Sequence, residues 1–203
     1  MVKTEYVMLN GVKYADVSGY ARDLPPKRRE KIERLRFEKD KLLSLTAGML
    51  IRNRIGNTPL SENEHGKPYA DGGQFFSVSH SGECVVIAVD DREIGIDVER
   101  LPDRDYLQIA ERFYHPNELA YVRRAEDSAR AFTYVWTRKE AYLKQIGIGI
   151  ATDLKAFDTV SGELSERVAS VDLEGYVISV CVEDSERLQD VYISELELKE
   201  VFY

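Results

Sequence analysis

Cysteine is scarce in this sequence, with two residues among 203. Two cysteines cannot build a disulfide framework of the kind that staples small secreted domains. Cys84 and Cys181 each lie in an apolar, strand-like run, where a free thiol behaves as a small hydrophobic side chain. We therefore expect both to be buried structural residues without a redox or metal role.

Long hydrophobic runs are also missing. The longest apolar stretches, such as Val85–Val89, are far shorter than the ~20 residues that span a bilayer. The first ten residues carry Lys3 and Glu5 and lack the apolar run of a signal peptide. These absences predict a soluble, cytoplasmic protein with no membrane association.

Positive charge is in the minority, because 28 Lys and Arg stand against 36 Asp and Glu and the net charge is -8. General binding to nucleic acid needs a basic surface, so we do not expect it. Residues 27–41 nevertheless hold eight basic and four acidic residues. Such a local excess would suit a defined anionic ligand, although this segment taken alone is better explained as a solvated helix with mixed charge pairs.

Apolar residues are plentiful, at 43% of the chain, which is enough for a proper core in one domain or in two small fused ones. Apolar periodicity and turn residues predict both helices and strands. The expected helices run from Pro25-Pro26, with a break, to about Ile55, and from Tyr106 to about Gln145, broken near His115-Pro116. The expected strands are one within residues 1–20, ending at an Asn10-Gly11 turn, then Phe75–Ser79, Cys84–Asp90, Ile94–Glu99, Ala156–Val160, Tyr176–Val182 and Val191–Leu198. Residues 60–74 are polar and rich in glycine, and predict a loop.

Two segments of the chain echo each other. Residues 82–90 and 174–184 are both apolar strands that begin just after a glycine and end in acidic residues. Any β-hairpin might share this pattern, but it fits a chain of two similar halves, 1–101 and 102–203, that meet near Leu101-Pro102. A site between the halves would then be expected, because pockets often form at such junctions.

One predicted strand carries two acids. Successive side chains of a strand face opposite sides, so Ile94, Ile96 and Val98 would face the core while Asp97 and Glu99 lie side by side on the other face. Two neighbouring carboxylates repel unless a cation or a proton lies between them. Mg²⁺ typically takes one or two carboxylates plus substrate phosphates. Taken alone, an ordinary amphipathic strand explains the pattern more simply.

Three further motifs carry polar groups. On the predicted helix around Trp136, Glu140 and Lys144 are four residues apart and share a face, either as a surface pair or as a metal ligand beside a phosphate-binding lysine. Ser79-His80 lies at a strand end beside a glycine turn and could bind phosphate, although a lone histidine is more often structural. Lys67, between glycine and proline, could be presented to an anion by its loop.

The order and spacing of these motifs resemble those of the surfactin-synthetase type of 4'-phosphopantetheinyl transferase. The resemblance covers nearly the whole chain and is weakest after Gly162. The segments that carry it are Pro26-Lys-Arg-Arg-Glu-Lys31, Gly66-Lys67-Pro68, Phe76-Ser-Val-Ser79-His80-Ser-Gly82, Ile94-Gly-Ile-Asp97-Val-Glu99, Phe113–Glu118 and Trp136-Thr-Arg-Lys139-Glu140-Ala-Tyr-Leu-Lys144.

That resemblance implies a fold and an activity. The implied fold is α+β, a pseudo-dimer of two similar halves, each a small, mostly antiparallel sheet packed on a long helix. The implied reaction is Mg²⁺-dependent transfer of 4'-phosphopantetheine from coenzyme A to a serine of an apo acyl or peptidyl carrier protein, with release of 3',5'-ADP. The two fused halves would supply the whole site, so a monomer is expected. The carrier would dock on the second half, near residues 145–157, with Lys155 as one contact.

The resemblance also implies residue roles. Asp97, Glu99 and Glu140 match the acids that hold Mg²⁺, and Glu140 is in addition our candidate for the base that accepts the serine proton. Lys144 matches a lysine that contacts the phosphates and assists the leaving group. The remaining matches are to positions that bind coenzyme A: Ser79 and His80 at its phosphates, Lys67 near the adenosine end, and Arg28, Lys31 and Ser44 around the 3'-phosphate.

Two other functions use the same residues. A Mg²⁺-dependent nucleotide pyrophosphatase would direct water, rather than a carrier serine, at the phosphorus. A non-catalytic coenzyme A or carrier-protein binding module would need no metal ligands, so the complete set of acids disfavours it. Dependence on a carrier protein separates the first alternative from transfer, and metal-free binding with unchanged affinity would support the second.

Overall fold

The computed structural model describes residues 2–56, 58–103, 106–149 and 152–203. Its strands are β1 (Lys3–Met8), β2 (Leu60–Glu62), β3 (Pro68–Ala70), β4 (Phe75–Ser81), β5 (Cys84–Asp90), β6 (Ile94–Arg100), β7 (Val168–Leu173), β8 (Tyr176–Val182) and β9 (Ile193–Glu195). Its α-helices are α1 (Tyr14–Val17), α2 (Pro26–Arg34), α3 (Glu38–Ile55), α4 (Tyr106–Phe113), α5 (Pro116–Arg124), α6 (Ser128–Ile146) and α7 (Leu198–Phe202). Short 3₁₀ helices are η1 (Ser18–Asp23), η3 (Leu154–Ala156), η4 (Glu163–Arg167) and η5 (Ser185–Asp190).

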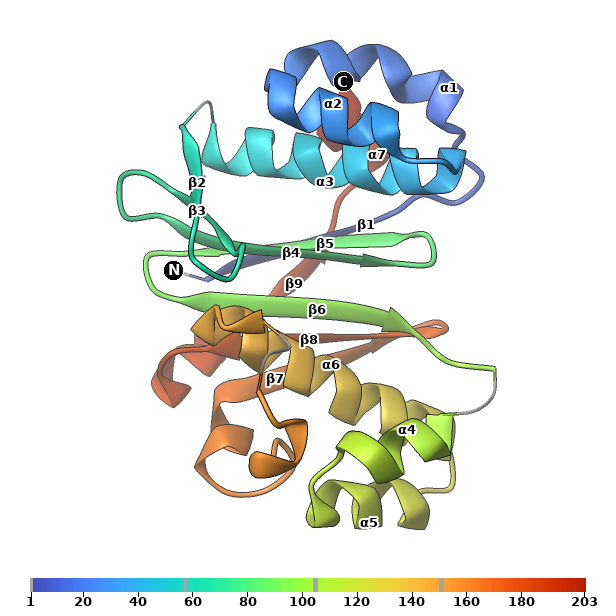
Figure 1. Ribbon diagram of the computed structural model, residues 1–203, viewed down its shortest axis with the longest axis vertical. Coiled ribbons are helices and arrows are strands. Elements are labelled where there is room, and N and C mark those ends of the chain that lie inside the picture. The colour runs from blue at the N-terminus through green and yellow to red at the C-terminus, as the bar shows by residue number, and fades with distance from the viewer. Residues whose placement is uncertain (1, 57, 104–105, 150–151) are drawn as a thin grey trace.

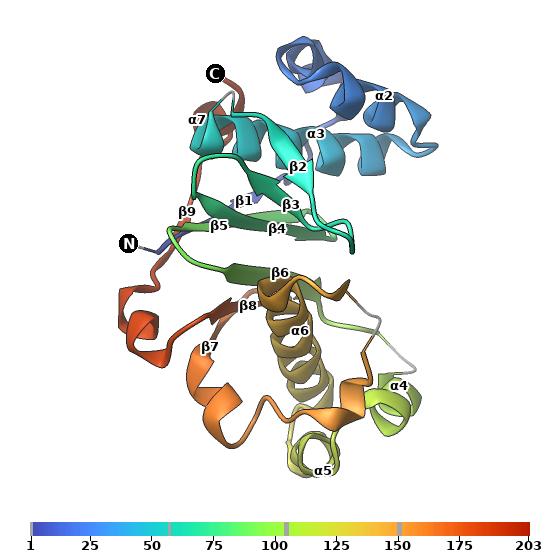
Figure 2. The same cartoon turned by 60° about the vertical axis from the view of Figure 1, so that its left-hand side comes forward.

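Two sheets lie between two long helices. The first sheet has the order β4-β5-β1-β9 and the second has the order β6-β8-β7. Helix α3 covers the outer face of the first sheet and α6 that of the second, with α4 and α5 at the far end of the molecule from α2 and α3 (Figures 1 and 2). This confirms the α+β prediction of small, mostly antiparallel sheets, each packed on a long helix.

Apolar alternation explains the layers. On β5, Val85 and Ile87 face α3, while Val86 and Ala88 face the second sheet. These side chains, like the apolar side chains of β6 and β8, are almost fully excluded from water. Burial of each of the larger ones stabilises the folded state by about 1.5–3 kcal/mol. The core between the sheets therefore fixes their stacking. Cys84 belongs to this core, which agrees with the structural role expected of it.

Helix α6 packs very closely on β6. A Cβ atom added to Gly95 would lie 1.9 Å from the carbonyl oxygen of Ala141, so only glycine fits there. Asp127 caps the start of the helix by accepting a hydrogen bond from the backbone of Arg130, and Gly147 ends it in the left-handed region at φ 72°. The helix therefore lies against the strand that bears Asp97 and Glu99.

A row of serine hydroxyls joins the two sheets. In the described part of the chain no backbone ladder connects β4 to β6. Instead, Ser77 accepts from the backbone of Ile96, Ser79 donates to Asp97, and Ser81 donates to Glu99. Strands β4 and β6 thus lie side by side (Figure 1) and are bridged by side chains. We call this row, Ser77, Ser79 and Ser81 with their partners, the serine seam.

Several predicted elements differ from the structure. Residues 60–74, predicted as a loop, contain the hairpin of β2 and β3. The strand predicted at Ala156–Val160 is wrong, because residues 154–156 form η3 and residues 157–160 form no strand. The strand predicted at Val191–Leu198 is the shorter β9, followed by α7, and β7 was not predicted. The long helices and the strands β5 and β8 are confirmed at their predicted positions.

The C-terminal end of the chain returns to the first sheet. Strand β9 pairs in parallel with β1, and α7 packs on α3. Strand β6, which precedes the predicted division at Leu101-Pro102, hydrogen-bonds within the second sheet. Judged by strand pairing, the chain therefore passes from the first sheet to the second between β5 and β6. Within the described ranges, no helix is both long and apolar enough to cross a membrane.

Candidate active site at the serine seam

The centre of the site is a triangle of side chains from three different elements. Lys144 Nζ, in the last turn of α6, donates to Asp97 Oδ1 on β6 at 2.6 Å and to Ser79 Oγ on β4 at 2.8 Å. Ser79 Oγ itself donates to Asp97 Oδ1 at 2.7 Å. The Asp97 side chain is 4% exposed, whereas that of Lys144 is 29% exposed. Three residues singled out from the sequence therefore converge, with the ammonium group reachable from solvent.

Two more acids border this triangle. Glu99 accepts from Ser81 Oγ at 2.7 Å, and burial together with the charge of Asp97 raises the pKa of its carboxyl. Burial and the charge of Asp97 likewise raise the pKa of Glu140. Lys144 lowers both values, but its single positive charge does not balance three carboxylates. The site therefore favours an added proton or an added cation.

The donor set suits a hard cation such as Mg²⁺. Asp97 Oδ2 is buried and has no hydrogen-bond partner, so one oxygen of the central acid is available to a metal ion. Asp97, Glu99 and Glu140 supply only oxygen ligands. The set is not preassembled, because among the described residues no three His, Cys, Asp or Glu side chains are already gathered as metal ligands.

Arg28 of α2 contacts α3, the helix that packs on β4 and β5. Arg28 Nη2 donates at 2.9 Å to the carbonyl oxygen of Ser44 on α3, and Arg28 Nε is buried without a partner. Burial lowers the pKa of His80, and the charges of Lys144 and Arg28 lower it further. A neutral imidazole and a guanidinium with a free donor can both bind an anion. Lys31 lies exposed on α2, one turn beyond Arg28.

Lys67 lies apart from this group. Its Nζ atom forms an ion pair with Glu93 and donates at 3.0 Å to the carbonyl oxygen of Gln145, at the end of α6. Its side chain is 14% exposed and its charge is met by these two partners. The structure therefore joins Lys67 to the helix that carries Lys144, while its predicted contact with the adenosine end stays a prediction.

A second lysine–carboxylate pair was not predicted as a unit. Lys139 Nζ lies 2.7 Å from Glu118 Oε2, and the two side chains are 1% and 0% exposed. Lys139 also donates to the carbonyl oxygens of Leu154 and Phe157, and Glu118 accepts from the backbone and hydroxyl of Thr159. Both residues stand in quoted motifs, but no local pattern shows that α5 and α6 bring them together. This closed group attaches residues 154–159 to α6.

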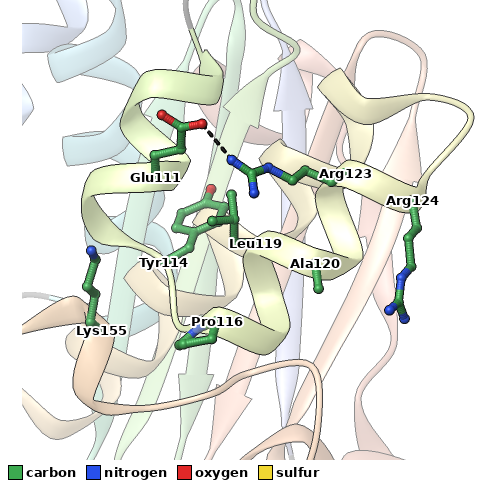
Figure 3. A pocket seen from close by; sticks show the side chains of 8 residues that line it. All are labelled: Glu111, Tyr114, Pro116, Leu119, Ala120, Arg123, Arg124 and Lys155. Atoms are coloured by element: carbon green, nitrogen blue, oxygen red, sulfur yellow. Dashed lines mark hydrogen bonds and ion pairs between the residues drawn. The ribbon is translucent and has the colours of Figure 1, made fainter.

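A groove lies between α4 and α5 at the far end of the second half. It has a volume of about 450 Å³ and an apolar floor that includes Tyr114 and Leu119. Figure 3 shows Lys155 and Arg124 on opposite sides of this groove, and Arg123 paired with Glu111 at 2.6 Å. Basic groups therefore outnumber acidic ones on the rim, although the protein as a whole is acidic.

Neither cysteine takes part in the site. Cys84 and Cys181 are free and buried, and burial raises the pKa of each thiol to about 12. A thiol with such a pKa is not a nucleophile near neutral pH. The expectation of two buried thiols is confirmed.

Several known proteins are similar in sequence to this chain. The family model of the 4'-phosphopantetheinyl transferase superfamily matches residues 93–194. The Sfp 4'-phosphopantetheinyl transferase of Bacillus subtilis (strain 168) is 28% identical over 194 residues, which cover 83% of this chain and 86% of that protein. The Gsp transferase of Aneurinibacillus migulanus is 38% identical over 129 residues, which cover 59% of this chain and 54% of that protein. The psf-1 transferase of Bacillus pumilus is 36% identical over 142 residues, covering 64% and 60%.

The family match contains β6 with Asp97 and Glu99, and α6 with Glu140 and Lys144. In the comparisons with single relatives, this chain spans little more than half the length of the Gsp and psf-1 proteins but most of the length of Sfp. The match covers half of the chain and includes the central residues of the site. This chain belongs to the 4'-phosphopantetheinyl transferase superfamily and, within it, to the Sfp type.

Proposed function

We propose that this protein transfers 4'-phosphopantetheine from coenzyme A to a serine of an apo acyl or peptidyl carrier protein. The serine hydroxyl oxygen forms a bond to the β-phosphorus, which bears pantetheine. The bond from that phosphorus to the bridging oxygen breaks, and its electron pair leaves with 3',5'-ADP. The observation that carries the proposal is the convergence of Lys144, Asp97 and Ser79 from α6, β6 and β4.

Asp97, Glu99 and Glu140 are the residues that would hold Mg²⁺. The ion, when bound, offsets the negative charge that develops on the phosphate oxygens. The partnerless Asp97 Oδ2 supports this assignment, because it leaves one carboxylate oxygen for a metal ion. Burial, and in addition the charge of Asp97, raises the pKa values of Glu99 and Glu140, so a bound cation would stabilise their charged forms. Glu140 is also the proposed base, since a raised pKa makes its carboxylate a better proton acceptor for the attacking serine.

Lys144 is the proposed contact to the phosphate that leaves. Catalysis of phosphoryl transfer depends chiefly on positioning and on charge neutralisation. An ammonium held by Asp97 and Ser79 and partly open to solvent can meet both demands. Transfer of a proton from Lys144 to the departing oxygen would stabilise 3',5'-ADP as it forms.

Coenzyme A would bind along the first half of the chain, residues 1–101. Ser79 and His80, whose imidazole pKa is lowered, are proposed to contact its phosphates, and Arg28, with its unpaired buried Nε, is proposed to lie near the 3'-phosphate. Lys31 and Ser44 are proposed to lie around the same 3'-phosphate.

The carrier protein would dock on the second half, residues 102–203. The groove between α4 and α5 has an apolar floor and a rim that includes Lys155 and Arg124, which suits an acidic, amphipathic helix (Figure 3). All of the proposed catalytic groups come from one chain, so the protein is proposed to act as a monomer.

The decisive experiment incubates the protein with coenzyme A, Mg²⁺ and a panel of apo carrier proteins, which are then weighed by mass spectrometry. The expected result is a gain of one phosphopantetheine group on a carrier serine, which EDTA abolishes. Release of 3',5'-ADP without a gain on any carrier would indicate a pyrophosphatase. Binding of coenzyme A with neither gain nor release, unchanged by EDTA, would indicate a binding module.

A further inference from the structure

The loop between β2 and β3 reaches across the molecule to the end of α6. Asn63 Nδ2 donates at 2.8 Å to the carbonyl oxygen of Gly147, and Lys67 Nζ donates at 3.0 Å to that of Gln145. The last carbonyls of a helix have no partner within the helix and form the negative end of its dipole. A neutral donor and a cation from another part of the fold therefore cap the C-terminus of α6.

Both polar atoms of the Asn63 amide form hydrogen bonds, each with a different partner segment. Its Oδ1 atom accepts from the backbone N–H groups of His65 at 3.0 Å and Lys67 at 2.9 Å, which shapes the loop. Its Nδ2 atom is left to hold the helix. This division of roles allows the link to the helix to be removed while the acceptor that shapes the loop is kept.

The contact between this loop and the end of α6 is close, and the charge of Lys67 is paired. A Cβ atom on Gly147 would lie 2.9 Å from Asn63 Nδ2 and 3.1 Å from Lys67 Cδ, so the loop and the end of the helix are in direct contact. Lys67 also pairs with Glu93, which immediately precedes β6. The loop thereby connects the end of α6 to the start of the strand that bears Asp97.

Lys144 lies in the turn that this loop holds. The ends of helices fray readily, and the Lys144 ammonium near this end lies 2.6 Å from Asp97. We propose that Asn63 and Lys67 are positioning residues that fix the last turn of α6 and so keep Lys144 on Asp97. Lys67 then acts through the helix rather than on coenzyme A. The catalytic part of this inference rests on the proposed transferase function.

Hydrogen exchange of backbone amides tests the proposal without a measurement of enzyme activity. Asn63→Asp keeps the acceptor that shapes the loop and replaces the donor to Gly147 with an oxygen that repels it. Backbone amides of residues 141–147 should exchange at least about 10-fold faster in this variant, with α3 unchanged. His65→Ala is the matched control, because its backbone still reaches Asn63 and its side chain contacts only Glu64 among the interactions described. Equal exchange in both variants would overturn the proposal.

Kinetics separate positioning from coenzyme contact. Asn63→Asp and Lys67→Met should each lower kcat about 10-fold with the KM for coenzyme A changed less than about twofold, and Lys67→Arg should restore most of the rate. A raised KM in Lys67→Met with kcat unchanged would instead make Lys67 a coenzyme ligand and contradict the proposal. If the wild-type protein transfers nothing, the proposed function fails, while the exchange experiment still decides whether the loop holds the helix.

Discussion

Two lysines of helix α6 form ion pairs with carboxylates of other elements, Glu118 on α5 and Asp97 on β6, and these two pairs differ in almost every respect except distance. Lys139 lies 2.7 Å from Glu118 with side chains 1% and 0% exposed. Lys144 lies 2.6 Å from Asp97 with side chains 29% and 4% exposed. In the first pair both oxygens of Glu118 accept further hydrogen bonds and Lys139 has two carbonyl partners. In the second pair Asp97 Oδ2 has no partner.

The difference separates a pair that stabilises the fold from a pair that we propose to act in the reaction. A buried ion pair contributes to folding only when its remaining polar atoms are satisfied, as in the pair of Lys139 and Glu118. The pair of Lys144 and Asp97 keeps one oxygen unused and one side partly open to solvent, which leaves it free to exchange partners during a reaction. The two lysines are five positions apart on one helix, and we propose different tasks for them because their surroundings differ.

The largest expected effect comes from breaking the closed pair. Glu118→Ala leaves the Lys139 ammonium buried without a counter-ion, so the free energy of unfolding should fall by about 3–5 kcal/mol. Urea unfolding measures this loss. Glu111→Ala, which breaks the exposed pair with Arg123, is the control and should cost less than about 1 kcal/mol. Similar losses in the two variants would remove the distinction between closed and exposed pairs.

Breaking the open pair should change activity instead. Asp97→Asn keeps the size of the side chain and removes its charge, so phosphopantetheine transfer should fall at least about 100-fold. The free energy of unfolding should change by less than about 1 kcal/mol, because solvent can reach the released Lys144. Rates come from mass spectrometry of the carrier, with Asp172→Asn on β7 as the control. A large loss of stability with activity retained would reverse the assignment.

The smallest expected effect is on the pH dependence of stability. The pKa of Glu140 is raised in the folded protein, mainly by burial, so the folded state keeps a proton that the unfolded chain has lost. Its contribution to the free energy of unfolding should therefore fall as pH rises from its ordinary value of 4.5 towards the raised value. Thermal unfolding without Mg²⁺ should show a shallower decline for Glu140→Gln than for wild type. An identical decline would mean that Glu140 is not desolvated as described.

The central site could be predicted from the sequence because its motifs sit on regular elements. Alternation along β6 separates Asp97 from the apolar core side chains, and helical spacing puts Glu140 and Lys144 on one face. Their meeting with Ser79 needed the stacking of two sheets, which no local pattern encodes. Lys67 shows most clearly what local sequence patterns cannot predict, since its partners Glu93 and Gln145 come from two other segments.

The errors in the fold have a common cause. The apolar residues near Phe157 predicted a strand, but the half-buried Phe157 ring packs against Lys139 and Tyr142 of α6 instead of in a sheet. The hairpin of β2 and β3 lies in a polar, glycine-rich segment, and it is anchored by contacts with the end of α6. In both places distant contacts decide the structure, whereas β5 and β8 follow from their own β-branched runs.

The serine seam has a consequence for how such a protein changes over evolutionary time. A backbone ladder is indifferent to the side chains it carries, so substitutions rarely move the strands it joins. At β4 and β6 the junction of the two sheets has, besides the apolar core, the hydrogen bonds of three hydroxyl groups, at Ser77, Ser79 and Ser81. Point substitutions there can shift β4 against β6 while each sheet keeps its own backbone pairing. Single substitutions at these three positions can therefore change the dimensions of the site in small steps during evolution.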